Sequence, residues 1–70
     1  MNMNQVQAVL KIAAAVIETI RESGSLGAPG GTIYAALMSH GCTLQQFDGL
    51  MAAIVGSGKV SKRGEFYFAN

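Results

Sequence analysis

Hydrophobic positions recur every three or four residues through the first part of the chain. They are Val6, Val9, Leu10, Ala13, Val16, Ile17 and Ile20. This spacing lines one face of an α-helix. Asn4 is a favourable N-cap with Gln7 three positions later, as in a capping box, and Gly24 can close the helix in the left-handed conformation. The pattern therefore predicts an amphipathic helix from about residue 4 to residue 24.

A second helix is predicted after Pro29, and Gly41 ends it. Its inward positions are Ile33, Tyr34, Leu37 and Met38. The start has two interpretations, because Pro29 suits a first helical turn and Thr32 suits a cap.

A third helix is predicted from Thr43, which has the capping-box spacing to Gln46. Its inward face consists of Leu44, Phe47, Met51, Ile54 and Val55, with Leu50 at the margin. The stretch from Gly56 to Gly58 ends this helix.

Hydrophobic and polar residues alternate along the last part of the chain, as they do in the strands of a β-hairpin. Residues 59–61 and 65–68 are the predicted strands, and residues 62–64 are the predicted turn. Val60, Phe66 and Phe68 would then face inward, and Lys59, Ser61, Glu65 and Tyr67 outward. The segment from Ser25 to Gly27 is long enough only to add an edge strand to this hairpin. We therefore predict an α+β fold with three helices, a C-terminal hairpin and a short third strand near Ser25–Gly27.

Composition supports one small globular domain spanning residues 1–70. The chain has 70 residues, of which 50% are hydrophobic and 13% charged, unlike a disordered tail. No apolar run approaches the roughly 20 residues that cross a bilayer, and the N-terminus lacks the basic region of a secretory signal. The single cysteine, Cys42, forms no disulfide within the chain and fits a reducing compartment. We expect a cytoplasmic protein.

Three stretches of the chain are similar to the winged helix-turn-helix family. They are Tyr34-Ala35-Ala36-Leu37-Met38, Gly41-Cys42-Thr43-Leu44 and Gly58-Lys59-Val60. They resemble that family's second helix, turn and wing entry, and the resemblance extends from about residue 4 to residue 68. It implies double-stranded DNA binding in transcriptional regulation, with the third helix in the major groove and the wing on phosphates.

Carried onto this chain, the resemblance implies two sets of DNA-contacting residues. The groove-facing set on the third helix is Thr43, Gln45, Gln46, Gly49 and Ala53. The wing set is Lys59, Lys62 and Arg63. The third helix departs from the usual pattern, because its only charged residue is Asp48 and the common arginine–guanine contact is absent. Either Gln45 or Gln46 could still contact adenine, or both could simply be solvated.

The wing is the better electrostatic candidate, because it holds three of the five basic residues. If all three neutralise phosphates, log K falls with log salt with a slope of about −2.7. The net charge of +1 adds no general attraction for nucleic acid. The same charges also have a structural interpretation, since lysines at a sheet edge discourage strand-to-strand association.

A protein-interaction function competes with DNA binding. The outer face of the third helix is made of small residues, namely Gly49, Ala52, Ala53 and Gly56. Such a face would let another protein or a second copy of this chain approach closely, or it could hold merely exposed helix formers. On the first helix, Ile12 lies in a weaker apolar band, as either a peripheral core residue or a dimer contact.

Candidate chemistry is sparse. His40 and Cys42 are the only histidine and cysteine, too few for a structural zinc site, and no third partner for nucleophilic catalysis is evident. The glycines between Gly27 and Gly31 lack the lysine of a phosphate-binding loop. We expect no enzyme activity, no metal or other cofactor, and no small-molecule substrate.

Overall fold

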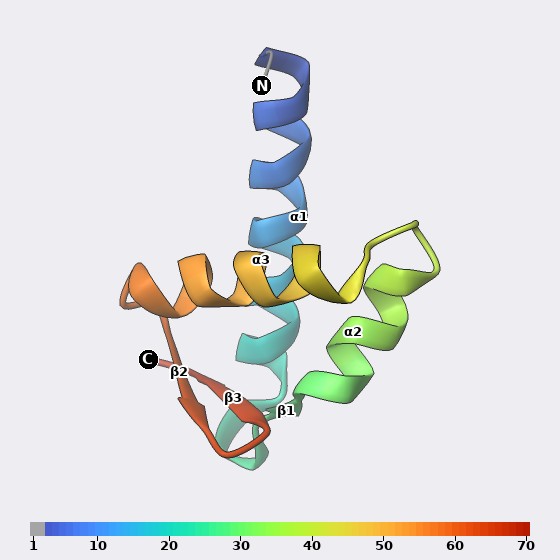
Figure 1. Cartoon of the computed structure of the whole chain (residues 1–70). Helices are drawn as coiled ribbons and strands as arrows, with labels where there is room; N and C mark the ends of the chain where they lie inside the picture. The colour runs from blue at the N-terminus through green and yellow to red at the C-terminus, as the bar shows by residue number, and fades with distance from the viewer. Residues whose placement is uncertain (1–2) are drawn as a thin grey trace.

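A computed structural model describes residues 3–70 and, within them, every side chain except that of Val6, whose predicted inward position lies outside the described part. The element order is α1 (Met3–Glu22), a 3-10 turn η1 (Gly24–Leu26), β1 (Ala28–Pro29), α2 (Gly30–Met38), α3 (Leu44–Gly56), β2 (Val60–Arg63) and β3 (Phe66–Ala69). The described residues thus form an α+β fold with three α-helices and a three-stranded antiparallel sheet (Figure 1).

The sheet joins the two halves of the chain. Its strand order is β1-β3-β2, so the short strand after α1 pairs with the last strand. Ala28 pairs with Tyr67 and Pro29 with Phe66, while Arg63 on β2 also pairs with Phe66. The hairpin therefore closes back on the segment that leads into α2.

The hydrophobic core lies where the three helices meet the inner face of the sheet. Its buried members are Val16, Ile20, Ala28, Ile33, Phe47, Met51, Ile54, Val60 and Tyr67. Beside it, the rings of Tyr34 and Phe47 are tilted against each other with centroids 5.2 Å apart, a favourable aromatic arrangement. Each of the three α-helices and three strands thus contributes at least one residue to the core.

The boundaries of α1 and α2 differ from the predicted ones by one to three residues, whereas α3 begins and ends as predicted. Asn4 lies inside α1 rather than at its cap, because the helix already begins at Met3. Gly24 adopts φ +59 just beyond the end of α1, as predicted. The N-cap of α2 is Pro29 and the helix begins at Gly30, one residue after the start that the Pro29 interpretation gives; Thr32 lies inside the helix, so the Thr32 interpretation is wrong. The third strand is Ala28–Pro29 rather than Ser25–Gly27, which lies mostly in the 3-10 turn.

Several predicted inward residues are exposed. They are Val9, Leu10, Met38 and Leu44. The reason for the first two is that α3 crosses α1 below its midpoint, so that the N-terminal half of α1 projects beyond the body of the domain (Figure 1). Met38 and Leu44 lie at the ends of their helices, next to the exposed turn. Helical periodicity identifies the apolar face of a helix, but it does not indicate how much of that face another element covers.

The predicted facing of β3 is wrong by one residue. Tyr67 is buried, with 5% of its surface exposed, whereas Phe66 is 43% exposed and Phe68 is half-buried. The turn is Gly64-Glu65, and Gly64 has φ +60, where hairpin turns favour glycine. Lys62 therefore pairs with Tyr67 and shares a face with Val60, because alternate residues of a strand face the same side. The loop register, not the sequence alternation, decides which aromatic ring is buried.

Candidate nucleic-acid interface

The N-terminus of α3 is fixed by the predicted capping box. The hydroxyl of Thr43 accepts a hydrogen bond from the backbone N–H of Gln46 at 3.1 Å, and Gln46 Oε1 accepts one from the backbone N–H of Thr43 at 3.0 Å. A bidentate contact to adenine needs both the oxygen and the nitrogen of a glutamine amide. Gln46 can therefore read a base only by giving up its half of the cap.

Gln45 is the remaining polar candidate on the first turn of α3, and its side chain is exposed. One turn further on, Gly49 is also exposed, and a Cβ added there would meet no other part of the chain within 4 Å. Ala52 and Ala53 are exposed as well. The outer face of α3 is thus exposed and made of small residues. Gln45 carries its only side-chain amide that is not part of the capping box.

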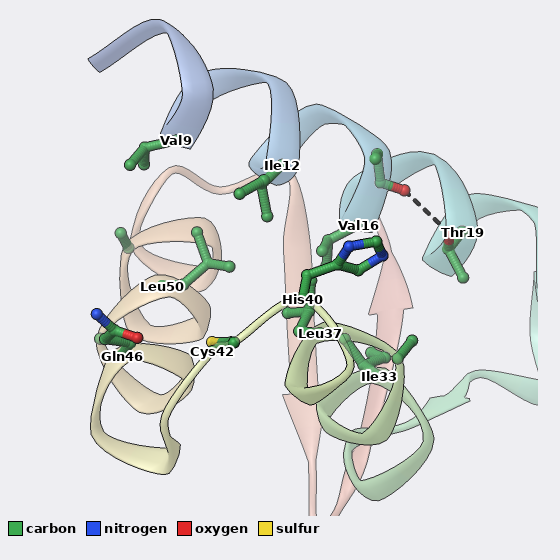
Figure 2. Close-up of a pocket in the computed structure, with 15 residues that line it drawn as sticks. Val9, Ile12, Val16, Thr19, Ile33, Leu37, His40, Cys42, Gln46 and Leu50 are labelled. Carbon is green, nitrogen blue, oxygen red and sulfur yellow. Dashed lines mark hydrogen bonds between the residues drawn. The ribbon is translucent and has the colours of Figure 1, made fainter. Parts of the chain in front are cut away.

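Part of the predicted α3 surface faces α1 rather than open solvent. Gln46, Gly49 and Ala53 line a groove of about 1000 Å³ that also has walls from α1 and α2. Figure 2 shows Val9 and Ile12 on the α1 side of this groove, opposite Leu50 on α3. We call this space the apolar groove, because its walls are largely aliphatic.

The hairpin presents two basic side chains on strand β2. Lys62 Nζ lies 5.8 Å from the centroid of the Tyr67 ring, and Arg63 Cζ lies 4.8 Å from the centroid of the Phe68 ring. Both residues are exposed. The predicted turn position was wrong for both, since they belong to a strand. The rings support the side-chain stems while the charged groups stay in solvent.

Lys59 lies apart from these two residues. Arg63 lies four positions further along the extended chain, a distance of about 13 Å. It lines a smaller groove with Glu18 and Arg21 of α1, and those two side chains form an exposed ion pair at 2.8 Å. The predicted wing set is therefore one pair of cations plus one separate cation.

The N-terminus of α2 adjoins the hairpin loop. The backbone N–H of Gly30 donates to the carbonyl of Glu65 at 2.8 Å, and the N-cap Pro29 provides no side-chain cap. Pro29, Phe66 and Arg63 form one row across the three strands, which places Arg63 about 10 Å from the start of α2. A helix N-terminus favours anions.

Phe66 is a candidate contact residue that the sequence pattern assigned to the core. It lies in the same row as Arg63, and its ring is largely exposed. Aromatic side chains occupy positions 66, 67 and 68 in succession. Hydrophobicity alone therefore gave no means of choosing which of the three faces solvent.

The two residues with potential reactivity lie at the turn between α2 and α3. Cys42 is half-buried, and its thiol donates to the carbonyl of Thr43 at 3.4 Å. His40 lies on the border of the apolar groove. Within residues 3–70, no three histidine, cysteine or acidic residues are grouped as metal ligands.

None of the described helices has the length and apolar character needed to cross a membrane. Comparisons with protein-family models, with curated proteins and with solved structures gave no match to this chain.

Proposed function

We propose that this chain is a winged helix-turn-helix domain that binds double-stranded DNA, mainly through phosphate contacts made by its hairpin. The observation that carries the proposal is the pair of exposed cations at the end of β2, Lys62 on the Tyr67 face of the sheet and Arg63 on the opposite face, in the row that leads to the N-terminus of α2. Two cations on one hairpin, near the positive end of the α2 dipole, suit the phosphate backbone.

The order of elements supports the same proposal. Helices α2 and α3 are joined by a short turn, and the sheet has the order β1-β3-β2 with the hairpin at the C-terminal end. In helix-turn-helix proteins, the second helix of this pair lies in the major groove. Here that helix would supply Gln45 as its base-reading amide, because Gln46 is held in the capping box.

This arrangement favours weak binding with limited base discrimination. Without a basic residue on α3, affinity depends on the hairpin and falls steeply with salt. Removal of one cation that neutralises a phosphate should make the slope of log K against log salt shallower by about 0.9.

The test compares two double variants that change the net charge equally. In the hairpin variant, Lys62→Gln with Arg63→Gln removes two charges but leaves side-chain stems over the rings. In the control, Lys11→Gln with Arg21→Gln removes two charges from α1. Fluorescence anisotropy with a mixed-sequence duplex, titrated at several low salt concentrations, should give a slope less steep by about 1.8 for the hairpin variant.

The control should keep nearly the slope of the unmodified chain. An equal decrease in slope for both double variants would mean that net charge alone drives binding, and the proposal would be wrong. Absence of any binding by the unmodified chain at the lowest salt would also reject it.

A further inference from the structure

The N-terminal half of α1, Met3–Ile12, which we call the α1 arm, is more apolar than an unpartnered helix in water should be. Val9 and Ile12, which lie on the groove side of the arm, are each 42% exposed. Lys11 is the arm's only charged residue. The arm projects past α3 (Figure 1), and no other element of the described chain covers its tip.

The apolar groove lies beside this arm and shares Val9 and Ile12 with it. The groove follows α1 from Val9 to Thr19, a stretch of helix about 15 Å long. The arm itself contains ten residues and has the same length. Each molecule therefore has a projecting apolar helix next to a groove of matching length.

We infer that a second copy of this chain docks here, with the α1 arm of each molecule seated in the apolar groove of the other. The two-fold arrangement is isologous, so one surface serves both molecules. Val9 and Ile12 of one copy then contact Leu50 and Ala53 of the other. Gly49 and Ala53 at the edge of the groove leave room for the partner's helix, and in the dimer they face this helix instead of DNA.

The exposed area fits this occupant. A compactly folded monomer of this mass exposes about 4200 Å², whereas the chain exposes 4850 Å². The chain as a whole thus exposes about 650 Å² more than this value, and the half-exposed Val9 and Ile12 of the α1 arm contribute to the excess; a standard interface buries roughly 800 Å² on each partner.

The groove can also be covered without burying charge. Its lining residues include no acidic residue, lysine or arginine, and its only ionisable side chains are those of His40 and Cys42 at the turn between α2 and α3. Two of its polar side chains already have partners inside the molecule: Thr19 donates to the carbonyl of Ala15 at 2.9 Å, drawn as a dashed line in Figure 2, and Gln46 is held in the capping box. Docking therefore leaves neither of them without a hydrogen bond, which would otherwise be costly.

The experiment is sedimentation equilibrium of the full chain without nucleic acid, from micromolar to millimolar concentration. The unmodified chain should shift from 7.3 kDa to twice that mass. Ile12→Lys should weaken the dimer at least tenfold, because it places two cations in a buried apolar contact. Leu10→Lys is the matched control, since Leu10 lies on the side of the helix away from the groove, and it should dimerise as the unmodified chain does.

A second variant and a direct contact measurement complete the test. Gly49→Leu fills the edge of the groove, and a Cβ at this position meets no other part of the same molecule within 4 Å. Like Ile12→Lys, this variant should dimerise more weakly than the unmodified chain, and its circular dichroism spectrum should be unchanged. In a mixture of ¹³C-labelled and unlabelled chains, filtered NOEs should join Ile12 to Leu50 or Ala53 of the other copy. A chain that stays at the monomer mass at 1 mM, equal behaviour of the Ile12 and Leu10 variants, or intermolecular NOEs confined to other surfaces would overturn the inference. The experiment contains no DNA, so its result is independent of the proposed DNA binding.

Discussion

Gly27 is the residue at which this fold depends most directly on the absence of a side chain. Its backbone has φ +77 and ψ +166, a region that is essentially restricted to glycine. A Cβ at this position would lie 2.5 Å from Cε1 of the Phe68 ring. Gly27 thus lets the last strand approach the turn that follows α1, and so it enables the pairing of β1 with β3.

Gly27→Ala should therefore destabilise the protein by about 2–4 kcal/mol, through backbone strain and overlap with Phe68. Gly31→Ala is the control, because Gly31 has no positive φ and a Cβ there meets nothing within 4 Å. Urea unfolding followed by circular dichroism measures both. Equal stability of the two variants would show that the close approach at Gly27 is unimportant.

At the scale of elements, local signals in the sequence located the helices well. The capping box of Thr43 and Gln46 was correctly predicted, because both partners lie within four residues and their hydrogen bonds depend only on local geometry. Val16, Ile20 and Phe47 were correctly assigned to the core. These residues lie where α1 and α3 each pack against at least two other elements of the fold. The positions that helical periodicity predicts to be inward are therefore also the buried ones.

Other features depend on contacts between distant segments, which the sequence pattern does not contain. The exposure of Val9 and Leu10 follows from where α3 crosses α1. The facing of β3 follows from a two-residue loop, and a shift of one residue turns every side chain to the other face. Gln46 was correctly predicted as the capping partner of Thr43, but its place in the wall of the apolar groove was not predicted. The predicted DNA contacts themselves stay predictions.

The β3 register gives a prediction that separates adjacent aromatic residues. Tyr67→Ala should remove about 3–5 kcal/mol of stability, because the ring is buried against Val60 and Ala28, and this amount is a large part of the stability of a 70-residue domain. Phe66→Ala should cost about 1 kcal/mol or less, as is usual for an exposed position. Thermal unfolding by circular dichroism distinguishes them, and the opposite order of stability would contradict the register.

At the scale of the whole molecule, the chain is elongated for its size. Its extents are 36 × 22 × 18 Å, and the long dimension runs with α1, whose N-terminal half lies outside the core (Figure 1). A 70-residue domain has little core to spare, so the half-exposed Val9 and Ile12 of this projecting helix are costly to leave in water. Docking of a second copy would return this helix to an apolar environment and give the two hairpins of a dimer twice the number of phosphate contacts.

If docking contributes to stability, the melting temperature must depend on protein concentration. Binding that is available only to the folded state stabilises it by mass action. For a dimer that unfolds to two monomers, a tenfold rise in concentration should raise Tm by about 5 °C, given the unfolding entropy of a 70-residue chain. Differential scanning calorimetry of the unmodified chain should show this rise, and Leu10→Lys should show it too. Ile12→Lys should melt at one temperature throughout, because its interface no longer forms while the core around Val16 and Ile20 is unchanged. A concentration-independent Tm for the unmodified chain, measured above the concentration at which sedimentation finds the dimer, would show that the interface adds nothing to folding stability.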